Sequence, residues 1–262
     1  GGRSVDASGG VLVTPAAFSF SLDSDRFFYK PGQRVTATVY AVDYDGKRQP
    51  DIEARMTLTP ERVPRIERRK PVLSRSVRLG KDGAAKLTFT MPKDGYYVLR
   101  AEAPDRQGRT ARGETRIWAA SDDWTGEGYD PAALEVAVDK KLYKAGDTAR
   151  VMINSPEKDC WVLFTIEGRR LFEQRVIRIE SGSAVLEVPI PTDFTPNVFA
   201  CASMIKGKKF VSAAKPVLVS PAGSFLTVRV EPDRPRYEPG DQATYTLTTL
   251  DAEGKGVPAQ VS

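Results

Sequence analysis

The stretch that decides the fold is DRFFYKPGQRV at residues 25–35, where Tyr29 precedes Pro31 and Gly32 at the start of a β-branched run. Proline and glycine at the two central positions specify a type II turn, because glycine accepts the positive φ of the second position. The run that follows, VTATVYAV (35–42), has the composition of a strand. The segment therefore predicts a turn that reverses the chain between two strands. We expect Tyr29 to close the end of the core and to keep its hydroxyl in water.

This segment occurs three times without gaps, as an internal repeat. The second copy is DKKLYKAGDTA (139–149), with Ala145 in place of proline, and the third is DRPRYEPGDQA (233–243). The tyrosines are 114 and 94 residues apart, which is about one β-sandwich domain per copy. We interpret the repeat as a structural turn motif, not a chemical one. Its residues are Tyr29, Pro31, Gly32, Tyr143, Gly146, Tyr237, Pro239 and Gly240.

The rest of the chain is composed of short strands separated by Asp-Gly, Glu-Gly and Ser-Gly turns. No segment of eleven or more residues has a clean 3.6-residue period, so helix should be scarce. Many short strands with Gly and Pro turns predict an all-β fold, as tandem immunoglobulin/fibronectin-like, seven-stranded antiparallel β-sandwiches. The expected strands lie at 35–42, 54–60, 84–91, 96–103, 149–155, 159–167, 174–180, 183–190 and 198–205.

The spacing of the repeat predicts the domain organisation. Two complete sandwiches are expected at 16–120 and 130–221, joined by a polar, glycine-bearing linker at 121–129. The first strands of a third, truncated sandwich are expected at 222–262. Residues 1–15 are interpreted as the last strand of a preceding domain, because VLVTP (11–15) nearly repeats VLVSP (217–221).

Composition argues against an enzyme. The chain has no histidine, which removes Ser-His-Asp and Cys-His nucleophile systems and His-ligated metal sites. Its two cysteines cannot form a Cys₄ zinc site. No pair among the 34 acidic residues stands out as a hydrolase pair. We therefore expect no catalytic residues, no bound metal and no cofactor.

The net charge of +5 is concentrated in one segment. A basic segment can bind an anionic partner such as nucleic acid or a membrane surface, or it can keep an exposed sheet edge from aggregating. No aromatic residue lies among residues 62–78, where the basic side chains are, to stack on bases, which favours the solvated edge. We expect no nucleic-acid partner and no membrane contact. The basic residues are Arg62, Arg65, Arg68, Arg69, Lys70, Arg75 and Arg78.

The two cysteines, Cys160 and Cys201, fall in expected strands of the second sandwich. The third and sixth strands of a seven-stranded sandwich are neighbours, so a disulfide is topologically possible. Two buried free thiols are the other possibility, and the sequence leaves both open. Trp161, beside Cys160, is expected to pack in the core.

The repeated Tyr-x-Pro-Gly motif, with DKKLYKAGDTA followed by INSP and VLFTIEG, resembles the macroglobulin-like domains of the α2-macroglobulin family. The bacterial branch of the family is the closer likeness, and it covers nearly the whole chain. In this family a stack of such domains forms a frame around proteases that cut an exposed bait segment. A Cys-x-x-Gln thioester motif occurs in some members, but Leu163 and Met204 stand where Cys160 and Cys201 would need glutamine.

The resemblance implies a scaffold segment of an endopeptidase inhibitor. Its partners would be neighbouring domains of the same parent chain, and proteases through the whole parent protein. It also implies a periplasmic or extracellular location. The bait insertion is expected in the truncated third domain, beyond Ser262.

Two other functions fit tandem sandwiches, because the fold alone does not fix function. A surface adhesin or similar immunoglobulin-like binding array is one, although the unequal repeat spacing argues mildly against it. Accessory domains of a carbohydrate-active enzyme are the other, with Trp118, Trp124 and Tyr129 as the only candidate ligand-stacking residues. These three aromatic residues are expected instead to pack the junction between domains.

Overall fold

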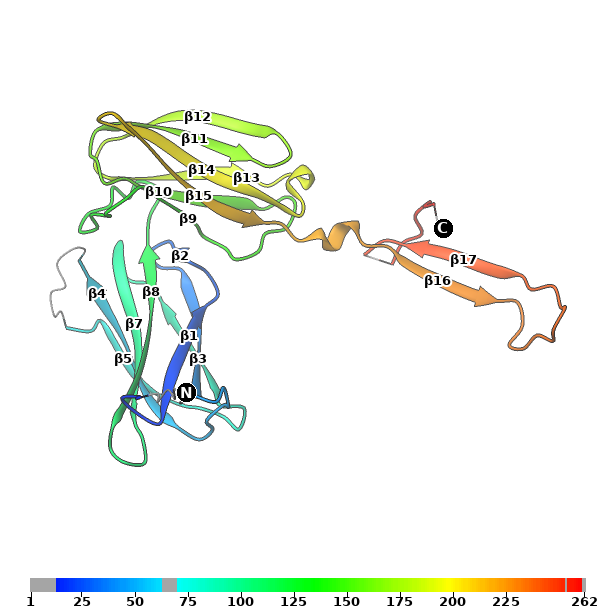
Figure 1. The fold of residues 1–262 in the computed structure, drawn as a ribbon, viewed down its shortest axis with the longest axis horizontal. Helices are drawn as coiled ribbons and strands as arrows, with labels where there is room; N and C mark the ends of the chain where they lie inside the picture. Colours follow the sequence, from blue (N-terminus) through cyan, green and yellow to red (C-terminus); the bar gives the residue numbers. More distant parts are fainter. Residues whose placement is uncertain (1–12, 63–69, 253, 261–262) are drawn as a thin grey trace, which may run out of the picture.

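The structure, a computed structural model, describes residues 13–62, 70–252 and 254–260. Over these residues it contains seventeen strands and two short 3-10 helices, so the predicted all-β class is confirmed. Two β-sandwiches follow each other along the chain, and a two-stranded hairpin stands apart from both (Figure 1). Within the described ranges, no helix is long and apolar enough to cross a bilayer.

The first sandwich packs a three-stranded sheet, in the order β1-β3-β6, against a five-stranded sheet, in the order β2-β8-β7-β4-β5. All neighbours are antiparallel except β2 and β8, which are parallel. The strands are β1 (Phe18–Ser24), β2 (Phe28–Tyr29), β3 (Arg34–Asp43), β4 (Glu53–Glu61), β5 (Leu73–Arg78), β6 (Ala84–Thr90), β7 (Gly95–Pro104) and β8 (Thr110–Ala119).

Alternation of side chains explains how these strands form two layers. In β3, Val35, Ala37, Val39 and Ala41 are fully buried, and the residues between them are partly exposed. Successive side chains of a strand point to opposite faces, so this pattern places one face of β3 on the core. The residues of the other face include two threonines, whose branched side chains favour the extended backbone.

The second sandwich has seven strands, as predicted, in sheets ordered β13-β10-β9 and β12-β11-β14-β15. Its counterpart of β2 is a single parallel bridge between Tyr143 and Val219. The four-stranded order matches β5-β4-β7-β8 of the first sandwich, strand for strand. The strands are β9 (Glu135–Val138), β10 (Thr148–Asn154), β11 (Cys160–Glu167), β12 (Leu171–Ile179), β13 (Ser183–Pro189), β14 (Asn197–Lys206) and β15 (Lys209–Leu218), with the 3-10 helix η1 (Thr192–Phe194) before β14.

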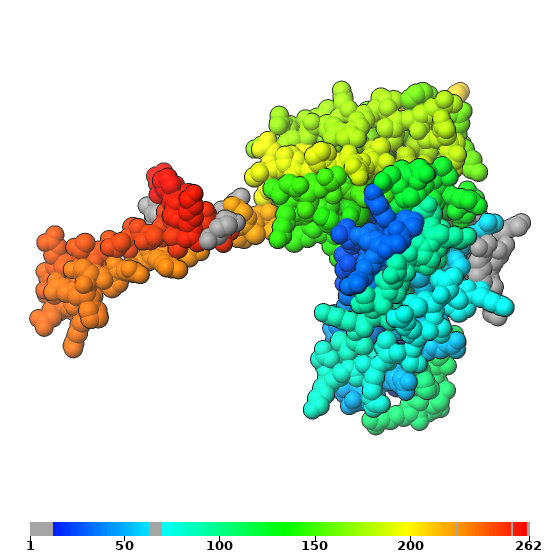
Figure 2. All heavy atoms as spheres, turned by 180° about the vertical axis from the view of Figure 1, so that it is seen from behind, coloured from blue at the N-terminus to red at the C-terminus, as the bar shows by residue number. Residues whose placement is uncertain are grey.

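A short 3-10 helix, η2 (Pro221–Ser224), leads to a hairpin of β16 (Thr227–Pro232) and β17 (Tyr245–Leu250). Figures 1 and 2 both show the hairpin extending away from the two sandwiches. Its apolar side chains Val230 and Leu247 lie opposite each other and are more than half exposed. The hairpin thus resembles the opening strands of a sandwich without an opposing sheet. The predicted domain boundaries stay a prediction, and residues 1–12 of the expected preceding strand lie outside the described residues.

The predicted basic segment lies on the β4–β5 hairpin. Strand β5 is at the edge of its sheet and carries Arg75 and Arg78, where charged side chains oppose edge-to-edge pairing. Arg62 and Lys70 flank the hairpin loop. Arg65, Arg68 and Arg69 lie outside the described residues.

Gly113 allows the two sheets of the first sandwich to approach closely. A Cβ atom at this position of β8 would lie 1.9 Å from the backbone oxygen of Phe20 in β1. Gly32 differs, because its φ of +79° favours glycine but the space around it is open. Close approach of backbone to backbone, not turn geometry, therefore requires glycine at position 113.

We expect Gly113→Ala to lower the free energy of unfolding by about 3 kcal/mol, because backbone must move to relieve the overlap. Gly32→Ala should cost about 1 kcal/mol, from the positive φ alone. Urea unfolding followed by tryptophan fluorescence measures both. Equal losses in the two variants would contradict the close approach of β1 to β8.

Candidate functional site: the junction between the two sandwiches

Each copy of the repeat is organised by the aspartate at its start. In the first copy, the carboxylate of Asp25 accepts a hydrogen bond from the Tyr29 hydroxyl at 2.7 Å and from the backbone amide of Thr36 at 2.8 Å. The Tyr29 hydroxyl in turn accepts from the backbone amide of Arg26 at 2.9 Å. The carboxylate therefore ties the end of β1 to the start of β3 across the turn.

The other two copies repeat these contacts at the same spacing. The carboxylate of Asp139 accepts from Tyr143 at 2.9 Å and from the Arg150 amide at 2.8 Å. The carboxylate of Asp233 accepts from the Tyr237 hydroxyl and from the Thr244 amide, the latter at 3.1 Å. The sequence contained the signal for this role, because an aspartate opens all three copies, but the contact between aspartate and tyrosine was not predicted.

The turn itself has the geometry of a type II turn. In the first copy the Gln33 amide donates to the Lys30 carbonyl at 3.0 Å across the turn. The φ angles of Gly32, Gly146 and Gly240 are +79°, +90° and +95°. The positive φ is kept in the second copy, where alanine replaces proline.

The expectation that the tyrosine hydroxyl stays in water is wrong for the first two copies of the repeat. Tyr29 and Tyr143 are fully buried, and each hydroxyl is satisfied by the aspartate four residues earlier. Burial, reinforced by the nearby carboxylate, raises the pKa of both tyrosines well above the ordinary value. Both hydroxyls therefore stay protonated and act as internal hydrogen-bond donors.

The first and second copies of the repeat meet at the junction between the sandwiches. Arg26 and Lys140 form an antiparallel β-bridge, and the Phe27 amide donates to the Asp139 carbonyl at 2.8 Å. The guanidinium of Arg26 reaches the Asp139 carboxylate at 2.7 Å, and Asp139 is only 4% exposed. Asp139 thus belongs to the turn of the second sandwich and to the contact with the first.

Arg150, on β10, makes a second polar contact across the junction. Its guanidinium donates to the Ala120 carbonyl at 2.8 Å and to Asp122 at 2.9 Å, and it lies over the ring of Phe28. Asp122 also accepts from Lys30 at 2.6 Å. The hydrogen bond from Lys30, together with Arg150, lowers the pKa of Asp122. The linker residue Asp122 is therefore held by both sandwiches.

An aromatic cluster, the junction cluster, fills the space beside these ion pairs. The prediction that aromatic residues near the linker pack the junction is confirmed. Tyr96 lies 5.0 Å from Trp118 and 5.1 Å from Tyr129, between ring centres. The linker was expected to be polar, yet two of its own aromatic residues, Trp124 and Tyr129, are buried in this cluster. The buried residues of the junction cluster are Phe28, Tyr96, Ala120, Trp124, Tyr129 and Met152.

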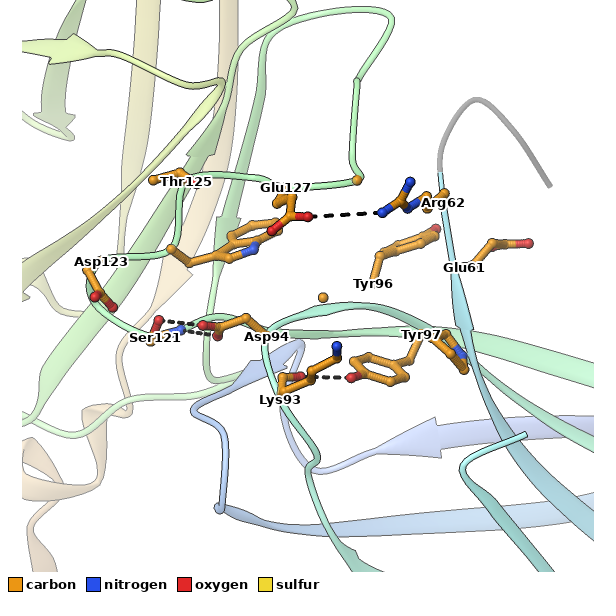
Figure 3. Close-up of a pocket in the computed structure, with 14 residues that line it drawn as sticks. Glu61, Arg62, Lys93, Asp94, Tyr96, Tyr97, Ser121, Asp123, Thr125 and Glu127 are labelled. Atoms are coloured by element: carbon orange, nitrogen blue, oxygen red, sulfur yellow. Dashed lines mark hydrogen bonds and ion pairs between the residues drawn. The ribbon is translucent and has the colours of Figure 1, made fainter. Parts of the chain in front are cut away.

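A cleft of about 380 Å³ opens beside the junction cluster, between the β7 turn and the linker (Figure 3). The carboxylate of Asp94 accepts from both the amide and the hydroxyl of Ser121, each at 2.7 Å. Arg62 faces Glu127 at 4.0 Å. These pairs fasten the linker to the first sandwich. Among the described residues, no group of three or more acidic or cysteine side chains is placed to hold a metal ion.

The two cysteines are free thiols, so a Cys160–Cys201 disulfide is not formed. Strands β11 and β14 are neighbours, as the topological argument required, but Cys201 lies opposite Thr165, five residues along β11 from Cys160. At about 3.4 Å per residue this offset is about 17 Å, far beyond the Cα separation of a disulfide. The expectation that Trp161 packs in the core is wrong, because its side chain faces outward and is 63% exposed.

The chain is similar in sequence to known proteins of one family. Residues 134–262 match the family described as the alpha-2-macroglobulin bait region domain. An alpha-2-macroglobulin homolog from Nostoc sp. is 24% identical over 190 residues, covering 67% of this chain and 10% of the relative. An alpha-2-macroglobulin from Ralstonia nicotianae is 25% identical over 266 residues, covering 96% of this chain and 16% of the relative.

Among solved structures, the native conformation of Escherichia coli alpha-2-macroglobulin matches 93% of this chain and 18% of that chain, with 15% identity and a TM-score of 0.35. The fold is that of tandem macroglobulin-like β-sandwiches. The chain is similar to bacterial α2-macroglobulins over most of its length, and residues 134–262 match the bait region domain of this family. The chain spans only a tenth to a sixth of the length of these two curated relatives.

Arg150→Ala tests the polar part of the junction. We expect it to lower the free energy of unfolding by about 2–3 kcal/mol, because the buried Ala120 carbonyl loses its charged donor. Arg100→Ala is the matched control, since Arg100 pairs with Glu114 at 2.8 Å on an exposed face. That control should change stability by less than about 0.5 kcal/mol. Thermal unfolding measures both, and an equal effect would show that Arg150 does not hold the junction.

Proposed function

We propose that this chain is a scaffold segment of a bacterial α2-macroglobulin-like endopeptidase inhibitor, which traps proteases after its bait is cleaved. The observation that supports this role is the junction, where buried ion pairs and an aromatic cluster fix one sandwich on the next. The parent protein is proposed to work in the periplasm or outside the cell. The segment itself contributes no side-chain chemistry to the trapping of the protease.

The proposed mechanism is mechanical. Contacts between domains are commonly loose, so relative motion is the default unless an interface is large and apolar. Here Arg26, Asp139 and Arg150 add directed polar contacts to an apolar interface. Two sandwiches joined in this way would move as one body when cleavage releases the frame around them.

The bait segment is placed in the unit that begins with the β16–β17 hairpin. The family match supports this placement, because it covers both the second sandwich and the hairpin. The third copy of the repeat forms its turn contacts in the hairpin while the apolar side chains Val230 and Leu247 stay exposed. This hairpin is therefore suited to be the start of a sandwich that carries an insertion.

The experiment is protease trapping by the whole parent protein, with trypsin as the probe. Trypsin should cleave the parent in one region, keep its activity on a small chromogenic peptide and lose most of its activity on casein. The 262-residue chain alone should leave casein digestion unchanged, because bait and frame must be present together. A parent protein that trypsin degrades while casein digestion continues at full rate would overturn the proposal.

A further inference from the structure

The outer face of the sheet β12-β11-β14-β15, named here the apolar face, exposes large apolar side chains from all four strands. Trp161, Ile205 and Phe210 are 63%, 66% and 69% exposed. Single exposed apolar residues are ordinary, but a contiguous group of this kind marks an interaction surface. The members of the apolar face are Trp161, Leu163, Val176, Phe199, Ile205, Phe210 and Leu218.

The strand register gathers five of these residues at one end of the sheet, and Phe199 and Leu218 lie at the other end, beyond Ser203 and Cys201. Leu163 lies opposite Val176 on one side and Ser203 on the other, and Ile205 lies opposite Phe210. Small residues such as Cys201 occupy the middle of β14. The result is a broad surface of the kind that another sheet can cover, because facing sheets interlock their side chains about 10 Å apart.

The first sandwich provides an internal comparison, since its sheet β5-β4-β7-β8 has the same strand order. The outer face of that sheet carries ion pairs, such as Arg100 with Glu114 at 2.8 Å and Arg112 with Glu102 at 3.0 Å. Among the described residues, none of the exposed large apolar side chains lies within these four strands, although the exposed Val72 directly precedes β5. The two sandwiches share a strand order but differ on the outer face of this sheet, which carries ion pairs in the first sandwich and large apolar side chains in the second. Solvent exposure alone does not explain this difference.

Nothing in the described chain covers the apolar face. The first sandwich packs on the opposite layer, where Met152 of β10 and the partly buried Ala137 and Val185 contact the junction cluster. The hairpin extends away from both sandwiches in the two opposite views (Figures 1 and 2). A sheet that is apolar on both faces is typical of a sheet covered on both sides.

We propose that the apolar face docks against the apolar face of another β-sandwich in the same parent polypeptide. The inference rests on the proposed function, which makes this chain part of a longer frame. The four strands and about seven residues of each give a footprint of roughly 450 Å². A stable complex of separate proteins buries about 800 Å² per partner, whereas domains of one chain bury about 300–750 Å² per side. Covalent linkage makes the smaller contact sufficient, because it raises the effective concentration of the partner domain.

The charges around the apolar face favour a protein partner over an anionic membrane. Arg178 at one edge is paired with Asp159 at 2.7 Å, and Lys206 is paired with Glu157 at 2.6 Å. These two basic side chains are thus neutralised in place, and their carboxylate partners would be repelled by anionic lipid headgroups. A rim of satisfied ion pairs around an apolar centre is typical of a protein interface.

Cys201 provides a native reporter in the middle of the apolar face. Alkylation by N-ethylmaleimide, read at the Cys201 peptide by mass spectrometry, compares the 262-residue chain with the whole parent protein. We expect alkylation to be at least about tenfold slower in the parent. The double variant Val176→Lys and Phe210→Lys should restore fast alkylation in the parent. The matched variant Ser76→Lys and Thr110→Lys, on the equivalent face of the first sandwich, should leave Cys201 protected.

The alternatives give different results. Equal alkylation rates in the chain and the parent would overturn the proposal. So would protection of the isolated chain that grows with its concentration, which indicates a second copy, or protection that requires vesicles of anionic phospholipid. Trypsin trapping is measured on the same parent sample. A parent that protects Cys201 but does not trap trypsin rejects the proposed function alone, and one that traps trypsin with Cys201 unprotected rejects this inference alone.

Discussion

The carboxylate of Asp139 is held from three directions: by the Tyr143 hydroxyl, by the Arg150 amide and by the Arg26 guanidinium. The first two donors belong to its own sandwich, and the third belongs to the preceding one. A buried carboxylate is costly unless hydrogen-bond donors surround it, so the three contacts favour one another. Formation of the turn is thereby coupled to docking of the two sandwiches. The remaining contacts of the junction extend from this point.

The linker contributes to the junction as a packed element. Trp124 and Tyr129 are buried between the sandwiches, and Asp122 accepts from Lys30 on one side and Arg150 on the other. A linker fixed by both neighbours limits the hinge motion that a short polar linker would permit. The hairpin shows the contrasting case, because its turn keeps the aspartate–tyrosine contact while the strands lie exposed. The motif therefore forms locally, and packing against a neighbour is a separate step.

Local rules predicted the features that depend on nearby residues. Alternation in segments such as 35–42 predicted the strands, and the repeat spacing predicted about one sandwich per copy. Seven strands were expected in each; the second sandwich has seven, whereas the first has eight because β2 pairs as a separate strand with β8. The junction depends on contacts between distant residues, so no local pattern indicated that Arg26 would reach Asp139, 113 positions away. Trp161 shows the limit of composition, because a tryptophan in a strand suggests a core residue, yet strand register places it outside. Register also explains why the two cysteines form no disulfide. Strands β11 and β14 are neighbours, but Cys201 lies opposite Thr165, five residues along β11 from Cys160.

The central claim, that the junction makes the two sandwiches one body, is tested most directly by ¹⁵N relaxation of the backbone amides in solution. We expect one common rotational correlation time for amides of the two cores, with shorter values confined to the β16–β17 hairpin. Asp139→Asn with Arg150→Ala serves as the uncoupled reference, in which each sandwich should tumble faster on its own. Separate and shorter correlation times for the two sandwiches in the unaltered chain would contradict the claim.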